Sequence, residues 1–130
     1  MSTIKRGVSL YSYQDEFYTG KMTLEDCIRE AAKTGATGIE FLPEQMLPTF
    51  PNISDDFVKQ WHEWLEKYGV EPVAYDAFLD NKLFANRMLT TSENVDMMKR
   101  DLKIANRLGC KILRTLVSTP LEVVKQSLPY

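Results

Sequence analysis

Apolar residues recur with the period of an α-helix in three separate stretches of the chain. Within each stretch they return every three or four positions, which places them on one face of a helix. Charged and polar residues fill the positions between them, as in helices that pack on one side and face water on the other. We therefore predict three amphipathic helices. Their apolar stripes are Leu24, Cys27, Ile28, Ala31 and Ala32; Phe57, Val58, Trp61, Leu65 and Tyr68; and Val95, Met98, Leu102, Ala105 and Leu108.

Short runs that are mostly apolar alternate with these helices and predict β-strands. The runs lack the strict apolar–polar alternation of a strand that has one face in water. Mostly apolar runs are typical of strands that are covered on both faces, as in parallel sheets. The predicted strands are residues 6–12, 37–42, 71–77 and 111–117.

A repeated motif connects each predicted helix to the strand that follows it. Segments 33–40, 67–74 and 107–114 each begin with a basic residue, one further residue and a glycine, and continue into a short apolar run. The cation complements the negative pole at the C-terminus of a helix, and the glycine takes the left-handed conformation just past the last turn. The motif therefore predicts a helix end followed by a strand.

Helix starts agree with this division of the chain. Thr23, Thr90 and Thr119 each lie three residues before a carboxylate. A hydroxyl at this spacing caps a helix N-terminus, and the carboxylate favours the exposed amides of the first turn. Ser54 is the expected cap of the second of the three amphipathic helices, and Thr119 predicts a further helix within which the chain ends.

The alternation of strands and helices predicts an α/β fold with parallel strands and right-handed crossovers. Four βα units in a single domain, residues 1–130, form either a small open sheet or half of a (β/α)₈ barrel. Composition alone does not separate these two architectures, because both begin on a strand and alternate in the same way.

Composition and charge exclude several classes of function. The chain has 130 residues and a formal net charge of −2, so nothing attracts it generally to nucleic acid or to an anionic membrane. No apolar stretch approaches the roughly 20 residues needed to span a bilayer. Cys27 and Cys110 lie within separate βα units, so we expect free thiols and a reducing cytoplasm. No glycine-rich phosphate loop or nucleophile elbow is present.

The ordered set of motifs resembles one family over essentially the whole sequence. The segments 7–13, 24–33, 35–40, 66–75 and 105–114 together are similar to the opening of a xylose-isomerase-like sugar isomerase/epimerase barrel. The resemblance implies that this chain is the N-terminal half of a (β/α)₈ barrel, whose active site lies at the C-terminal ends of the strands.

The resemblance also implies what the chain lacks. In this family a divalent metal (Mn, Mg, Co or Zn) is held by two glutamates, an aspartate and a histidine, mainly from strands five to eight. We therefore expect no catalytic residue and no metal ligand in this chain, and no activity from it alone. The ends of predicted strands two and three carry no histidine, unlike true xylose isomerases and DNA-repair endonucleases. A sugar or sugar-derivative isomerase/epimerase is the expected parent enzyme, and a C-glycoside-cleaving metalloenzyme of the same fold is an alternative.

A second hypothesis makes the chain a non-catalytic assembly module. A half-barrel leaves the edges of its first and last strands without partners, and such edges invite pairing with another chain. The partner would be a C-terminal half-barrel or a second copy, so we expect an oligomer in solution.

Four residues are the candidate substrate-binding groups of this chain. Tyr13, with Tyr11, would present an aromatic wall, Glu40 and Asp76 would bind sugar hydroxyls, and Arg114 would bind an anionic oxygen. Each has a structural alternative. The tyrosines would pack in the core, Glu40 would bond loop amides or water, and Asp76 would cap a loop. Arg114 would pair with Glu40 or Asp76, and we expect it to be buried and paired.

Overall fold

Helices and strands alternate along the chain, with two short helical turns after the first strand. The structure is a computed structural model that describes residues 4–79, 87 and 89–117. The elements are β1 (Gly7–Ser9), the 3₁₀ helix η1 (Leu10–Tyr13), α1 (Gln14–Tyr18), α2 (Leu24–Lys33), β2 (Gly38–Phe41), α3 (Pro43–Met46), α4 (Asp55–Tyr68), β3 (Glu71–Leu79), α5 (Thr91–Arg107) and β4 (Ile112–Val117).

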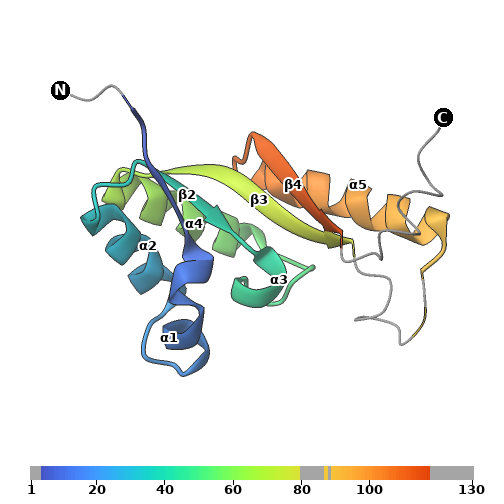
Figure 1. The fold of residues 1–130 in the computed structure, drawn as a ribbon, viewed down its shortest axis with the longest axis horizontal. Coiled ribbons are helices and arrows are strands. Elements are labelled where there is room, and N and C mark those ends of the chain that lie inside the picture. Colours follow the sequence, from blue (N-terminus) through green and yellow to red (C-terminus); the bar gives the residue numbers. More distant parts are fainter. Residues whose placement is uncertain (1–3, 80–86, 88, 118–130) are drawn as a thin grey trace.

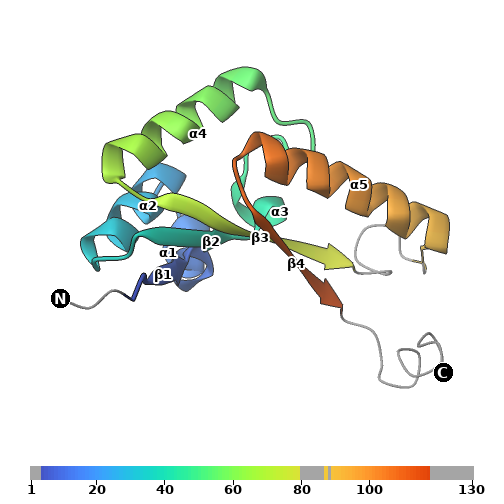
Figure 2. The ribbon, with the colours of Figure 1, turned by 90° about the horizontal axis from the view of Figure 1, so that it is seen from above.

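The four strands form one parallel sheet in the order β1-β2-β3-β4. The helices α2, α4 and α5 lie along one face of this sheet (Figures 1 and 2). The predicted α/β fold with parallel strands is confirmed. Because the strands are parallel, their C-terminal ends meet at one edge, and the turns η1 and α3 follow β1 and β2 there.

The first strand is shorter than predicted, and the chain turns into a 3₁₀ helix at Leu10. The side chain of Leu10 is fully buried in the core, whereas that of the next residue, Tyr11, is half exposed. Residues 10–13 were expected to lie within or just beyond a strand, so this is a correction. Another short helix, α3, follows β2 and begins at Pro43, which stands in the first helical turn where no amide donor is needed. The helix predicted after Thr119 lies outside the described residues.

The predicted helix ends match the structure. Thr23 and Thr90 each form a capping box with the carboxylate three residues later, and the Ser54 side chain accepts a hydrogen bond from the Phe57 amide. Past the helix ends, Gly35, Gly69 and Gly109 have φ angles of 84°, 66° and 81°. A side chain is strained in this left-handed region, so a glycine is the residue that fits there.

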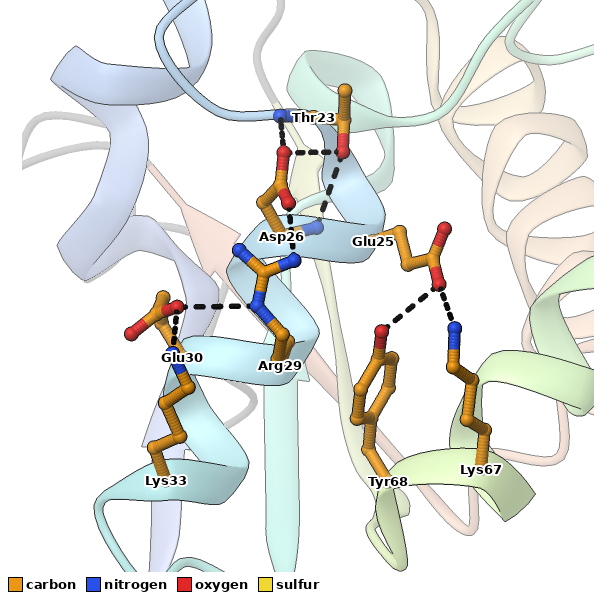
Figure 3. A network of polar contacts seen from close by, with 8 residues as sticks. All are labelled: Thr23, Glu25, Asp26, Arg29, Glu30, Lys33, Lys67 and Tyr68. Atoms are coloured by element: carbon orange, nitrogen blue, oxygen red, sulfur yellow. Dashed lines mark hydrogen bonds and ion pairs between the residues drawn. The ribbon is translucent and has the colours of Figure 1, made fainter.

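A network of polar contacts connects α2 and α4 at the protein surface (Figure 3). The carboxylate of Glu25 accepts hydrogen bonds from Lys67 Nζ at 2.8 Å and from Tyr68 Oη at 2.9 Å. Exposed ion pairs contribute little to stability, roughly 0–1 kcal/mol each. The network therefore orients the two helices, and apolar burial beneath it supplies most of the attraction between them.

The buried stripe of α5 differs from the predicted one. Val95 and Leu102 are 45% and 51% exposed, whereas Asp101 is 1% exposed. Tyr75 of β3 donates a hydrogen bond to Asp101 Oδ1 at 3.2 Å, and Arg100 donates two more to the same oxygen. These partners allow a carboxylate to enter the core. Ala105 and Leu108 are buried as predicted, and Asp101 and Ile104 are buried in place of Val95 and Leu102.

An aromatic cluster joins the sheet to the helices. The ring of Trp61 on α4 lies 4.8 Å from the ring of Phe41 on β2, and Phe41 contacts Tyr75 on β3 at 5.8 Å, measured between centroids. Trp61 Nε1 also donates a hydrogen bond to the Leu108 carbonyl at 3.1 Å. All three side chains are fully buried, so this cluster links β2, β3, α4 and the end of α5.

Replacing Trp61 with phenylalanine should lower the free energy of unfolding by about 2–3 kcal/mol. The variant leaves the buried Leu108 carbonyl without its donor and removes ring volume from a packed site. Urea unfolding measures the loss. Trp64→Phe is the matched control, because Trp64 lies at the edge of the core against Phe57, and it should cost about 1 kcal/mol or less. Equal losses in the two variants would contradict the assigned role of Trp61.

Candidate functional site

Charged side chains collect at the C-terminal edge of the sheet, on the face opposite the helices. On β2, Ile39 and Phe41 pack in the core, so Glu40 between them projects to the other face. On β3, Tyr75 and Ala77 pack in the core, which turns Asp76 to the same side as Glu40. The ladder pairs Asp76 with Arg114 of β4.

Arg114 holds both carboxylates in a fork. Its Nε donates to Asp76 Oδ1 at 2.7 Å, and its Nη2 donates to Asp76 Oδ2 at 2.7 Å and to Glu40 Oε1 at 2.9 Å. The bidentate contact with Asp76 fixes the plane of the guanidinium. Nη1 has no hydrogen-bond partner among the residues that the structure describes.

Burial is uneven within this group of three. Asp76 is fully buried, and the exposed fractions of the Glu40 and Arg114 side chains are 30% and 51%. Arg114 is therefore paired as expected, but the expectation that it is buried is wrong. It is the last of the three residues along the chain, on the edge strand β4, where no further strand of the described sheet covers it.

The electrostatics of the site follow from this arrangement. Burial raises the pKa of Glu40, the neighbouring Asp76 carboxylate raises it further, and Arg114 and a hydrogen bond from Ser9 act in the opposite direction. The contact with Asp76 raises the pKa of Arg114, so the guanidinium stays charged. The group of three thus has a permanent cation that is half exposed and held rigidly.

The structure does not bring Tyr13 to this group. Tyr13 lies in η1 and packs against the hydrophobic core. Burial raises the pKa of its hydroxyl, and the nearby Glu30 and Cys27 of α2 raise it as well, which places the ring beside that helix. Of the four predicted residues, the structure therefore joins Glu40, Asp76 and Arg114, and a substrate-binding role for any of them stays a prediction.

A cavity of about 300 Å³ opens beside Arg114. The sequence analysis considered Tyr11 and Arg114 of its wall, whereas it gave no role to Ser9 or Phe78. Two signals would have found part of it: Phe78 lies two positions after Asp76 and so projects to the same face, and Ser9 pairs with Glu40 in the ladder. The lining residues are Ser9, Tyr11, Leu42, Gln45, Phe78 and Arg114.

The described residues do not make a metal centre by themselves. Over residues 4–79, 87 and 89–117, no three or more histidine, cysteine, aspartate or glutamate side chains are grouped so as to hold a metal ion. The two carboxylates of the site already bind Arg114. The metal expected for a complete barrel therefore stays a prediction. Within the same described part, no helix is long and apolar enough to cross a membrane.

A comparison with protein families assigns the chain to a class. Residues 28–127 match the model of the xylose isomerase-like TIM barrel family, so the chain belongs to that family. The four parallel strands, with α2, α4 and α5 between them in the chain, are then half of the eight-stranded barrel, as predicted.

Particular relatives match nearly the whole chain. The C-glycoside deglycosidase alpha subunit of Arthrobacter globiformis is 36% identical over 98% of this chain and 36% of its own length. The 3′-dehydrocarminate deglycosidase alpha subunit of a Microbacterium species is 30% identical over 95% of this chain and 36% of its own length. This chain therefore spans about a third of the length of these relatives.

A solved structure has the same fold. The probable 3-DHS dehydratase AsbF from Bacillus anthracis superposes with a TM-score of 0.63 and 15% identity, over 87% of this chain and 38% of that one. At this identity the likeness concerns the fold alone.

Removing the Arg114 guanidinium should destabilise the protein through Asp76. Arg114→Met leaves a buried carboxylate unpaired, and we expect a loss of about 1–3 kcal/mol in urea unfolding, reduced because half of Arg114 faces water. In an Asp76→Asn background the same substitution should cost at least about 1 kcal/mol less. Arg29→Met, which removes exposed ion pairs on α2, is the control and should cost about 0.5 kcal/mol or less. Additive effects of the Arg114 and Asp76 substitutions would show that the fork contributes no coupling.

Proposed function

We propose that this chain is the N-terminal part of an enzyme that cleaves C-glycosides, and that it forms one wall of the substrate pocket. The observation that carries the proposal is the position of Arg114, a fixed and half-exposed cation beside a cavity at the C-terminal edge of a barrel sheet. In barrels of this kind, the active site lies at that edge. The deglycosidase relatives, which match nearly the whole chain, support the class of substrate.

The proposed substrate suits a cation at this place. A 3′-dehydro sugar carries a ketone, which acidifies the C–H bond at the neighbouring C2′ carbon. Loss of that proton leaves an enolate, and its electron pair forms a C1′–C2′ double bond as the bond from C1′ to the aglycone breaks. The aglycone carbon leaves with the bonding electrons and takes up a proton. Negative charge develops on the ketone oxygen, and a preorganised guanidinium stabilises such charge strongly in a site shielded from water.

Arg114 is the residue of this chain that we assign to that oxygen. Nε and Nη2 are committed to Asp76 and Glu40, which leaves Nη1 as the donor for a substrate. Glu40 and Asp76 then act as positioning residues, because they hold the guanidinium and do not need to touch the sugar. The same proposal includes a divalent metal, whose ligands we expect among residues beyond this chain.

An isomerase/epimerase that acts on a sugar is the other enzyme of this class. It shares the proton transfer next to a carbonyl. The names of the relatives favour the C-glycoside alternative, since the deglycosidase alpha subunits match across more than nine-tenths of this chain. The word subunit in those names also supports assembly with a second chain.

Cleavage is tested with the complete polypeptide that contains this chain, together with its partner subunit if it has one. We expect release of the aglycone from an aryl C-glycoside oxidised at C3′, measured by liquid chromatography. Arg114→Met should lower kcat/KM by about 100-fold, the typical cost of one lost oxyanion donor. Arg6→Met, at the opposite edge of the sheet, is the control and should leave the rate unchanged. Interconversion of a free sugar without aglycone release would favour the isomerase, and activity that is indifferent to Arg114 would reject its assigned role.

An assembly role has a separate structural basis. Val73 and Ile112 are 41% and 54% exposed. Ile112 lies two positions before Arg114 on β4 and therefore on the same face of the sheet, away from the helices. Val73 is the extra residue at a shift of register between β2 and β3, and its side chain packs against Gly38, which lies two positions before Glu40. The outer strands β1 and β4 each have a single neighbour in the described sheet. In a closed barrel such apolar side chains fill the interior. We infer that this face is covered by the other half of the barrel, from a longer chain or from a second copy.

The 130-residue chain on its own should therefore not be a stable monomer. We expect dimers or larger species in analytical ultracentrifugation at micromolar concentration, because apolar surface and strand edges are left open. Val73→Lys with Ile112→Lys should shift the distribution toward the monomer. Tyr18→Lys, an equally exposed aromatic position on α1, should leave it unchanged. A single monomer species that unfolds cooperatively at high dilution would overturn the expectation.

A further inference from the structure

The cavity beside Arg114 has an aromatic wall that the proposed sugar chemistry leaves unused. Tyr11 and Phe78 contribute rings to it, and Leu42 contributes an aliphatic side chain that is almost completely buried. Tyr11 is 52% exposed, although Leu10 beside it is fully buried. The 3₁₀ turn η1 therefore anchors its first residue in the core and presents the next one at the mouth of the barrel.

The polar groups of this cavity are too few for a sugar ring. A sugar presents hydroxyls around its whole edge, and each needs a partner when it leaves water. Four lining residues have polar side-chain atoms, namely Ser9, Gln45, Arg114 and the single hydroxyl of Tyr11. The hydroxyl of Ser9 already bonds Glu40, and two nitrogens of Arg114 bond carboxylates. The cavity fits a different kind of ligand: a flat ring system that carries an oxygen atom at its edge. Its wall has two aromatic rings, a leucine side chain and one edge of a guanidinium.

The volume is consistent with such a group. About 300 Å³ is at the lower limit of ordinary ligand cavities, which range over roughly 300–1,000 Å³. Aromatic side chains bind flat ligands by offset or edge-to-face stacking, and the plane of a guanidinium stacks or donates to the same ring system. Arg114 lies at the boundary between this aromatic wall and the two carboxylates.

We propose that the cavity is the subsite for the aromatic aglycone of the substrate, with Tyr11 and Phe78 in contact with its ring and Gln45 on its oxygen. The inference rests on the proposed function in one respect: it assumes that the substrate has an aglycone. Arg114 then stands where the sugar and the aglycone meet. Tyr11 and Phe78 determine specificity for the leaving group and take no part in moving the proton.

The test measures aglycone binding separately from turnover. The probe is 7-hydroxycoumarin, a flat fluorescent phenol without a sugar, titrated against the complete protein by fluorescence anisotropy. We expect Tyr11→Ala and Phe78→Ala each to weaken binding by about ten-fold or more and Tyr11→Phe to retain it, because the ring is the binding group. Tyr18→Ala is the matched control, since Tyr18 is 57% exposed on α1 and is not one of the residues that line this cavity. Circular dichroism confirms that each variant is folded.

The kinetic arm uses the same variants with an oxidised aryl C-glycoside. Tyr11→Ala should raise KM about ten-fold while kcat changes little, because it removes binding shared by ground state and transition state. Probe binding that depends on Tyr11 and Phe78 in a protein without deglycosidase activity would sustain the subsite and reject the proposed function. The subsite proposal would be overturned if a protein with deglycosidase activity did not bind the probe, or bound it equally well after substitution of Tyr11 and Phe78. The proposed function would be unaffected by that result.

Discussion

The contact of Arg114 with Asp76 is the interaction on which the C-terminal edge of the sheet depends. Asp76 is fully buried, and a buried carboxylate is tolerated only when it is paired and hydrogen-bonded. Arg114 meets that requirement with two short bonds and reaches Glu40 with a third. One side chain thereby connects β2, β3 and β4 at the edge where barrel enzymes place their chemistry.

The two faces of the parallel sheet differ in composition and in burial. Residues that alternate toward the helices form a closed core around Trp61, with the rings of Phe41 and Tyr75 against it. Residues that point away from the helices are charged at the C-terminal edge of the sheet and apolar toward its N-terminal edge. Val73 lies in that apolar part and packs closely against Gly38: a Cβ atom added to Gly38 would lie 2.5 Å from Val73 Cγ2. The helical side is therefore complete in itself, and the opposite side has the composition of an interior without its other half.

The family and the length of its members fit that division. The chain spans about a third of the relatives it matches, and its fold spans about two-fifths of the solved dehydratase. A sheet that is finished on one face and open on the other is what the first half of a closed barrel presents. The proposed pocket uses the open side, where the aromatic wall around Tyr11 adjoins the fixed cation.

Much of the fold could be predicted because its signals are local. Capping by Thr23 and Thr90 and the left-handed turns at Gly35, Gly69 and Gly109 involve neighbours in sequence, and all agree with the structure. The alternation of strands and helices was sufficient to predict a parallel sheet, because short connections and right-handed crossovers leave few other arrangements of the strands. The pairing of Arg114 with a carboxylate was also foreseeable from the strand ends.

Contacts distant in sequence decided the rest. Periodicity placed Val95 and Leu102 in the core, but a hydrogen bond from Tyr75 allowed Asp101 to enter instead. The turn at Leu10 moved Tyr13 beside α2 and left Tyr11 at the mouth, and the edge position of β4 left Arg114 half exposed. A sequence by itself determines which residues favour a helix, a cap or a strand. Burial and pocket geometry are properties of several strands at once, so only the tertiary structure assigned them.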